Sequence, residues 1–150
     1  MTDKGAIVTG GTRGIGLAIA KRLADDGWNL LLTYRGDDEA AKAAEQELAG
    51  SSGNIKVIAG DIANADDAGR IIEEGMAHLG KIDALVNNAG ITRDTLMMRM
   101  SEDDWDAVLD TNLKGAFLLS KAVMRPMLRA RAGRIVNLTS VVGLVGNAGQ

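Results

Sequence analysis

A chain of 150 residues that is 46% hydrophobic and 25% charged has the composition of an ordinary globular domain. The absence of cysteine excludes disulfides and thiolate metal sites, and no uncharged run is long enough to span a membrane. Charge is uneven: residues 1–110 carry −9, whereas residues 111–150 carry +6 and contain no acidic residue. We therefore expect one cytoplasmic domain over residues 1–150, with no bound metal, no membrane contact and a basic face on its C-terminal part.

The first predicted strand covers residues 5–9 and runs into TGGTRGIG at residues 9–16, which opens a helical pattern. A glycine-rich turn between a strand and a helix gathers free backbone N–H groups at the positive end of the helix dipole, and this arrangement suits a pyrophosphate. The glycines Gly10, Gly14 and Gly16 are spaced G-x-x-x-G-x-G, unlike the more familiar G-x-G-x-x-G. A tight turn without a ligand is therefore the alternative interpretation.

Four further apolar runs predict strands near residues 29–34, 55–59, 83–87 and 134–139, separated by segments of helical length. Right-handed crossovers place helices on both faces of a parallel sheet, so this series predicts an α/β fold. We expect a Rossmann-type doubly wound parallel sheet of order 3-2-1-4-5, with the ligand crevice beyond the carboxyl ends of the first and fourth strands.

Small polar residues follow the later strands of this predicted sheet. They are Thr33-Tyr34-Arg35, Gly60-Asp61-Ile62, Asn87-Asn88-Ala89-Gly90 and Thr139-Ser140, in chain order. The carboxyl ends of parallel strands meet at one edge of a sheet, so these residues are expected to lie together. A solely structural sheet needs only turns at that edge, and the pattern therefore favours a ligand site.

Five motifs stand in one register along the chain. They are TGGTRGIG, Asp61-Ile62, NNAG at residues 87–90, Asn112 in TNLKGAF and Ser140 in NLTSVVG. On these motifs the whole chain resembles the short-chain dehydrogenase/reductase family. The runs NNAGITRD, LMMRM, SKAVMRPM and SVVGLVGNAGQ are similar to its 3-oxoacyl-[acyl-carrier-protein] reductase branch.

The choice of cofactor can be argued from the end of the second strand. An acidic residue there accepts a hydrogen bond from the ribose 2′-hydroxyl of NAD, whereas an arginine accommodates the extra phosphate of NADP. The strand ends Thr33-Tyr34-Arg35 without an acid, and Arg13 lies inside the glycine loop. Two guanidinium groups favour NADP(H). The alternative is that both arginines are solvated surface charges.

The resemblance implies a set of cofactor-binding residues. Asp61 and Ile62 would flank the adenine, and Asn87, Ala89 and Gly90 would line the ribose and nicotinamide. The cofactor-binding residues predicted besides Asn87 are Gly10, Thr12, Arg13, Gly14, Ile15, Gly16, Arg35, Asp61, Ile62, Asn88, Ala89 and Gly90. For Asn87 and Asn88, the structural alternative is that their amides tie neighbouring strands together.

The resemblance also implies two catalytic residues for hydride transfer to a carbonyl. Ser140 resembles the family serine that hydrogen-bonds the substrate oxygen, and Asn112 resembles the asparagine that helps to hold a proton-relay water. The alternatives are a strand-end cap for Ser140 and a helix-interior or capping amide for Asn112.

The sequence lacks the tyrosine that acts as the general acid in this family. The family tyrosine, with a lysine one helical turn later, would fall shortly after Gln150, and the only tyrosine present is Tyr34. The family fold also continues with further strands and helices. We therefore expect residues 1–150 to form an incomplete NADP-binding domain that is poorly stable and inactive as a reductase on its own, with the strand at 134–139 as an exposed edge.

By resemblance, the function is NADPH-dependent reduction of 3-oxoacyl-[acyl-carrier-protein] to the 3-hydroxyacyl product in fatty-acid biosynthesis. The alternatives are an acetoacetyl-CoA reductase of the same family and a catalytically inactive nucleotide-binding fragment. Arg125, Arg129 and Arg131 would attract an acidic carrier protein, unless they form only a solvated helix face. The resemblance further implies a homo-oligomer, a tetramer when complete. The acidic balance and the lack of a binding motif argue against nucleic acid.

Overall fold

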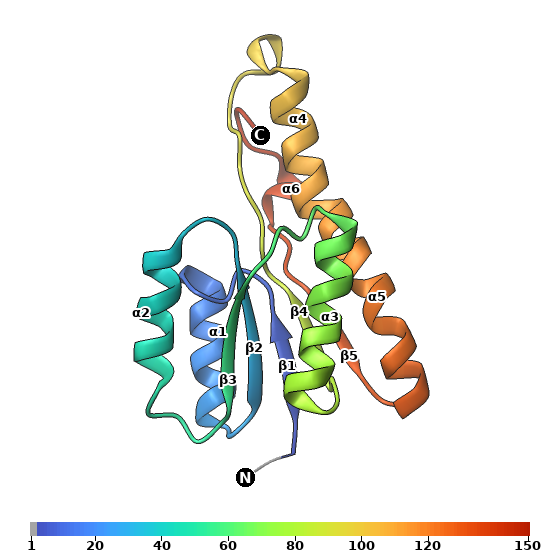
Figure 1. Ribbon diagram of the computed structural model, residues 1–150. Coiled ribbons are helices and arrows are strands. Elements are labelled where there is room, and N and C mark those ends of the chain that lie inside the picture. Colours follow the sequence, from blue (N-terminus) through green and yellow to red (C-terminus); the bar gives the residue numbers. More distant parts are fainter. Residues whose placement is uncertain (1–2) are drawn as a thin grey trace.

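The apolar runs form one parallel sheet with the order β3-β2-β1-β4-β5 (Figure 1). The computed structural model describes residues 3–150. The strands are β1 (Gly5–Val8), β2 (Asn29–Tyr34), β3 (Ile55–Ala59), β4 (Ala84–Asn87) and β5 (Arg134–Asn137). The fold class, the strand order and the position of each strand confirm the prediction from the sequence, and the boundaries differ by at most two residues.

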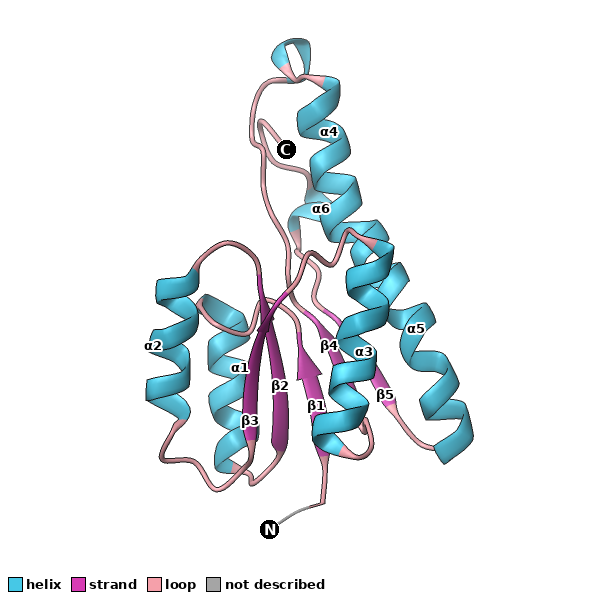
Figure 2. Ribbon diagram, viewed as in Figure 1, coloured by secondary structure: helices cyan, strands magenta, loops and turns pink. Residues whose placement is uncertain are grey.

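Helices cover both faces of the sheet (Figure 2). α1 (Gly14–Asp25) and α2 (Asp38–Leu48) lie on one face, and α3 (Ala65–Leu79) and α5 (Gly115–Ala130) lie on the other. The turn η1 (Met97–Arg99), α4 (Glu102–Leu109) and α6 (Val142–Val145) extend beyond the carboxyl ends of the strands, and the π-helical segment η2 (Asp110–Lys114) joins α4 to α5. Within residues 3–150, no helix is long and apolar enough to cross a membrane.

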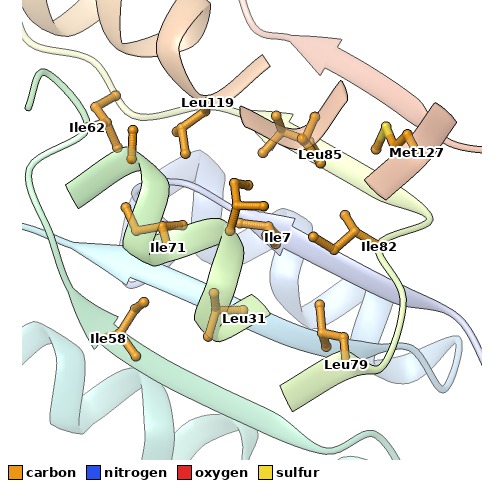
Figure 3. Packing of buried hydrophobic residues seen from close by; sticks show 13 residues of the cluster. Ile7, Leu31, Ile58, Ile62, Ile71, Leu79, Ile82, Leu85, Leu119 and Met127 are labelled. Carbon is orange, nitrogen blue, oxygen red and sulfur yellow. The ribbon is translucent and has the colours of Figure 1, made fainter. Parts of the chain in front are cut away.

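Alternate residues of the central strand pack the two faces, since successive side chains of a strand point to opposite sides. Ile7 of β1 packs with Leu31 and Leu85 beneath α3 and α5, as Figure 3 shows. Ala6 and Val8 belong to the cluster that α1 and α2 cover. All three β1 residues are fully buried, so β1 is held on both faces and positions the glycine loop that follows it.

β5 forms one edge of the sheet and pairs with β4 alone among the strands of residues 3–150. Val136 of this strand is exposed, in agreement with the expected apolar edge. The segment after α6 returns to the loop that follows β4, where Thr95 N donates to Gly149 O at 2.8 Å. Gln150 Nε2 also donates to Asp94 Oδ2 at 3.0 Å. These two hydrogen bonds place residues 149–150 beside the loop after β4 (Figure 1).

Candidate functional site

Two adjoining cavities open at the carboxyl ends of the strands. The glycine-loop cavity, of about 350 Å³, lies between the loop after β1 and the ends of β2, β3 and β4. The β5 cavity, of about 550 Å³, lies between the end of β4, η2, α5 and the segment after β5. The two share Ile62, Asn88, Ala89 and Gly90, so one elongated ligand can occupy both. Among the described residues, no three acidic, histidine or cysteine side chains are grouped to hold a metal ion.

The glycine-loop cavity brings together twelve of the residues predicted to bind the cofactor, whereas Asn87 lines only the β5 cavity. The wall of the glycine-loop cavity contains Gly10, Thr12, Arg13, Gly14, Ile15, Gly16, Arg35, Asp61, Ile62, Asn88, Ala89 and Gly90. The two predicted catalytic residues, Asn112 and Ser140, line the β5 cavity instead. The fold therefore separates the candidate residues into two connected groups.

The glycine loop has the backbone shape that an anion site needs. Gly10 and Gly14 have φ values of 60° and 54°, which side chains other than glycine rarely adopt. A Cβ on Gly16 would lie 2.1 Å from Gly10 O, so only glycine lets α1 start this close to the loop. A Cβ on Gly14, by contrast, would meet no atom within 4 Å. α1 has no side-chain cap and no acidic residue in its first turn, so its N–H groups are available to a phosphate.

Thr9 and Asn88 fasten the glycine loop to the end of β4. The Oγ1 of Thr9 accepts hydrogen bonds from the N–H groups of Asn88 and Ala89, each at 3.0 Å. Asn88 Nδ2 donates to the carbonyl oxygens of Thr9 at 2.8 Å and Gly10 at 3.1 Å. The Asn88 amide thus ties two strands together while its residue also lines the glycine-loop cavity. Sequence reasoning assigned no role to Thr9, although its place directly after an apolar run was a signal.

Asn87 makes a second link, between β4, β5 and α5. Its Nδ2 donates to Asn137 Oδ1 at 2.8 Å and to Ser120 Oγ at 3.2 Å. Its own Oδ1 is buried and has no hydrogen-bond partner among the described residues. The geometry of both asparagines therefore matches the structural alternative, in which their amides connect neighbouring strands.

Arg13 and Arg35, the two arginines on which the expectation of NADP(H) rests, each pair with a carboxylate in the cavity wall. Arg13 Nη1 lies 3.4 Å from Asp37 Oδ2, and Arg35 Nη1 lies 2.9 Å from Asp61 Oδ2. Asp37 follows the second strand after the turn at Gly36, whose φ is 74°. The end of the second strand carries no acid in the sequence, but the turn brings Asp37 back to the cavity.

A network of charged groups holds the segment after β3. Asp61 Oδ1 accepts from Ala63 N at 3.0 Å, and Asp61 N donates to Asp67 Oδ2 at 2.8 Å. A hydrogen bond from Arg70 and then the one from the Asp61 backbone lower the pKa of Asp67. Arg70 also pairs with Glu74 at 3.0 Å. These contacts fix the carboxylate of Asp61 beside Arg35 at the cavity wall.

Asn112 lies in the π-helical segment η2, and both ends of its amide are engaged. Its Oδ1 accepts from Ile91 N at 2.8 Å, and its Nδ2 donates to Ile91 O at 2.9 Å. π-helical turns occur mostly as single turns inside α-helices and are frequent at functional sites. The side chain of Asn112 thus anchors the segment after NNAG from within a helix, which matches the helix-interior alternative.

Ser140 lies at the wall of the β5 cavity, beyond the end of β5. It is exposed, and its Oγ accepts a hydrogen bond from Val142 N at 3.2 Å. This contact is a local turn cap, which uses the hydroxyl as an acceptor. The hydroxyl proton is still available for donation to another group in the cavity.

Comparison with protein families matches residues 4–150 to the family described as short chain dehydrogenase. The chain belongs to this family. The order of the motifs, the strand order and the glycine loop before α1 agree with the resemblance seen in the sequence.

The chain is also similar to curated short-chain dehydrogenases over nearly all of its length. It is 48% identical over 147 residues to the 3-oxoacyl-[acyl-carrier-protein] reductase FabG of Staphylococcus aureus strain Mu50. The aligned region covers 98% of this chain and 60% of that relative. It is 45% identical over 150 residues to the 3-oxoacyl-[acyl-carrier-protein] reductase of Synechocystis, and the aligned region covers 100% of this chain and 61% of that relative. The chain therefore spans about 60% of the length of these relatives.

Proposed function

We propose that this chain is the cofactor-binding portion of an NADPH-dependent 3-oxoacyl-[acyl-carrier-protein] reductase of fatty-acid biosynthesis. The proposal rests on one agreement: the cavity suits a nicotinamide cofactor, and the similar proteins are named as reductases. Twelve of the residues predicted to bind the cofactor line one cavity, and the relatives at 45–48% identity are named 3-oxoacyl-[acyl-carrier-protein] reductases. The β5 cavity continues that space toward Ser140 and leaves room for a substrate.

Residues of the glycine-loop cavity would hold the cofactor. The open loop around Gly14 would bind the pyrophosphate, Arg13 and Arg35 the 2′-phosphate, and Asp61 and Ile62 the adenine. Asn88, Ala89 and Gly90 would lie beside the nicotinamide ribose, where the two cavities join. When bound, NADPH would supply the hydride for carbonyl reduction.

The protein's own contribution is to polarise the carbonyl and to keep the two cavities in register. In the proposal, Ser140 donates its hydroxyl proton in a hydrogen bond to the substrate oxygen. Asn112 acts as a positioning residue through its two bonds to Ile91. Tyr34 is the only tyrosine of the sequence, and it donates to Asp38 Oδ1 at 2.9 Å beside the adenosine end of the cavity. Tyr34 is therefore not assigned as the general acid.

The proposed partners are an acyl carrier protein and further copies of the chain. Arg125, Arg129 and Arg131 are exposed near the C-terminal end of α5, in the part of the chain that has no acidic residue. Such a cluster attracts an acidic carrier and raises its rate of encounter. In the complete protein, the proposed assembly is a homotetramer.

Enzyme kinetics on the full-length protein test the proposal. We expect NADPH-dependent reduction of acetoacetyl-[acyl-carrier-protein], and Arg131→Glu should raise the KM for this substrate roughly tenfold because charge complementarity speeds the encounter. The KM for acetoacetyl-CoA should change little, and Lys42→Glu on α2 serves as the matched charge control.

Two other outcomes would favour the alternatives. Equal use of both substrates, with no effect of Arg131→Glu, would support an acetoacetyl-CoA reductase. Binding of NADPH without turnover of either substrate would support a nucleotide-binding module without catalysis.

A further inference from the structure

We propose that Asp37 is a specificity-determining residue of the glycine-loop cavity, where it competes with a ribose 2′-phosphate for Arg13 and so limits the preference for NADPH over NADH. The inference rests on the proposed function, because it concerns the cofactor that this cavity would take. It goes further in assigning an opposing role to a carboxylate that the arginine pattern alone does not reveal.

The position of Asp37 carries the first step. Its Oδ2 lies 3.4 Å from Arg13 Nη1, and both residues line the cavity. The Arg13 side chain is 77% exposed and the Asp37 side chain 45% exposed, so this ion pair is weakly held and open to exchange. A phosphate that binds Arg13 must therefore share the guanidinium with the Asp37 carboxylate or displace it.

The second step is that Asp37 cannot move far when it is displaced. It is the N-cap of α2, and its Oδ1 accepts a hydrogen bond from Ala40 N at 3.0 Å. Its carbonyl oxygen also accepts from Ala41 N at 3.1 Å. With one carboxylate oxygen committed to the helix, the negative charge stays beside the phosphate subsite.

The third step is the charge balance around that subsite. Arg35 is already paired with Asp61 at 2.9 Å, so part of its positive charge is balanced there and less of it offsets the charge of Asp37. A dianionic 2′-phosphate would face Asp37 and be repelled by it. A 2′-hydroxyl is neutral and can donate a hydrogen bond to the same carboxylate. Asp37 therefore disfavours the phosphorylated ribose selectively.

The test is to remove the charge and keep the cap. Asparagine caps a helix as well as aspartate, so Asp37→Asn should leave α2 and the thermal unfolding temperature unchanged. In titrations of the full-length protein by cofactor fluorescence, we expect its Kd for NADPH to fall about five- to tenfold, as for the loss of one partly screened charge near a phosphate. The Kd for NADH should change by less than about twofold.

Asp38→Asn is the matched control. Asp38 is the next residue on the same helix and pairs with Tyr34, but it is not part of the cavity wall. An equal gain in NADPH affinity from both variants would overturn the proposal, since net charge alone would then explain it. Unchanged or weaker NADPH binding by Asp37→Asn would also overturn it. If the wild-type protein binds neither NADPH nor NADH, the proposed function itself fails, and the inference fails with it.

Discussion

Thr9 is a buried hydroxyl that serves two strands at the end of β1. Its Oγ1 accepts the N–H groups of Asn88 and Ala89 at 3.0 Å and donates to the Val86 carbonyl oxygen at 3.4 Å. Thr9 is fully buried, so water cannot replace these partners if the hydroxyl is lost. One side chain thus joins the start of the glycine loop to the start of the NNAG segment, the two walls of the glycine-loop cavity.

We expect Thr9→Val to lower the free energy of unfolding by about 2 kcal/mol or more, because it leaves two backbone N–H groups without an acceptor. Urea unfolding followed by circular dichroism measures the change. Thr9→Ser keeps the hydroxyl and loses one methyl group, so it should cost only about 1 kcal/mol. Equal losses in the two variants would show that packing, and not the hydroxyl, stabilises this junction.

The residues of the site could be predicted from the sequence to different degrees. Gly10, Gly14 and Arg35 follow strands that hydrophobic runs make visible, and parallel strands place their carboxyl ends together. The role of Asp37 depends on the turn at Gly36 and on the cap of α2, which no local pattern specifies. The engagement of Asn112 with Ile91 likewise depends on a tertiary contact between η2 and the loop after β4.

At the scale of the element, α3 carries two glycines that face different surroundings. Gly75 is buried against β1, and a Cβ there would lie 2.7 Å from Ile7 Cδ1. Ile7 is itself fully buried, so it has little room to move. Gly69, on the same helix, has no atom within 4 Å of the position of a Cβ. The apolar period of the sequence predicts the helix, but only the packing across to β1 distinguishes the two glycines.

Alanine at each of these positions should change stability in opposite directions. Gly69→Ala removes a helix-destabilising residue from an open position and should raise the free energy of unfolding by up to about 1 kcal/mol. Gly75→Ala gains the same helix propensity but forces a methyl group into the core, which costs about 1–3 kcal/mol. We therefore expect the two variants to differ by about 2 kcal/mol in urea unfolding. Equal stabilities would mean that Ile7 moves aside freely.

At the scale of the whole molecule, one stripe of exposed apolar side chains runs along the side of η2 and α5 that faces away from the sheet. Leu113, Phe117, Met124 and Leu128 are all exposed, and their spacing of four, seven and four residues places them on one stripe. The opposite side of α5 packs into the core next to α3, on the same face of the sheet. An apolar stripe of this length is typical of an interface, in agreement with the proposed assembly of several copies.

A charge placed in the stripe should separate the copies of the full-length protein. We expect Phe117→Asp to convert the proposed homotetramer into a smaller species in sedimentation velocity, because an interface must desolvate the new carboxylate without a partner. Met98→Asp puts the same charge on η1, at another exposed apolar residue outside the stripe, and should leave the assembly intact. Circular dichroism would check that both variants fold. If both variants dissociate, or neither does, the stripe is not the surface that joins the copies, and its exposed side chains have another role.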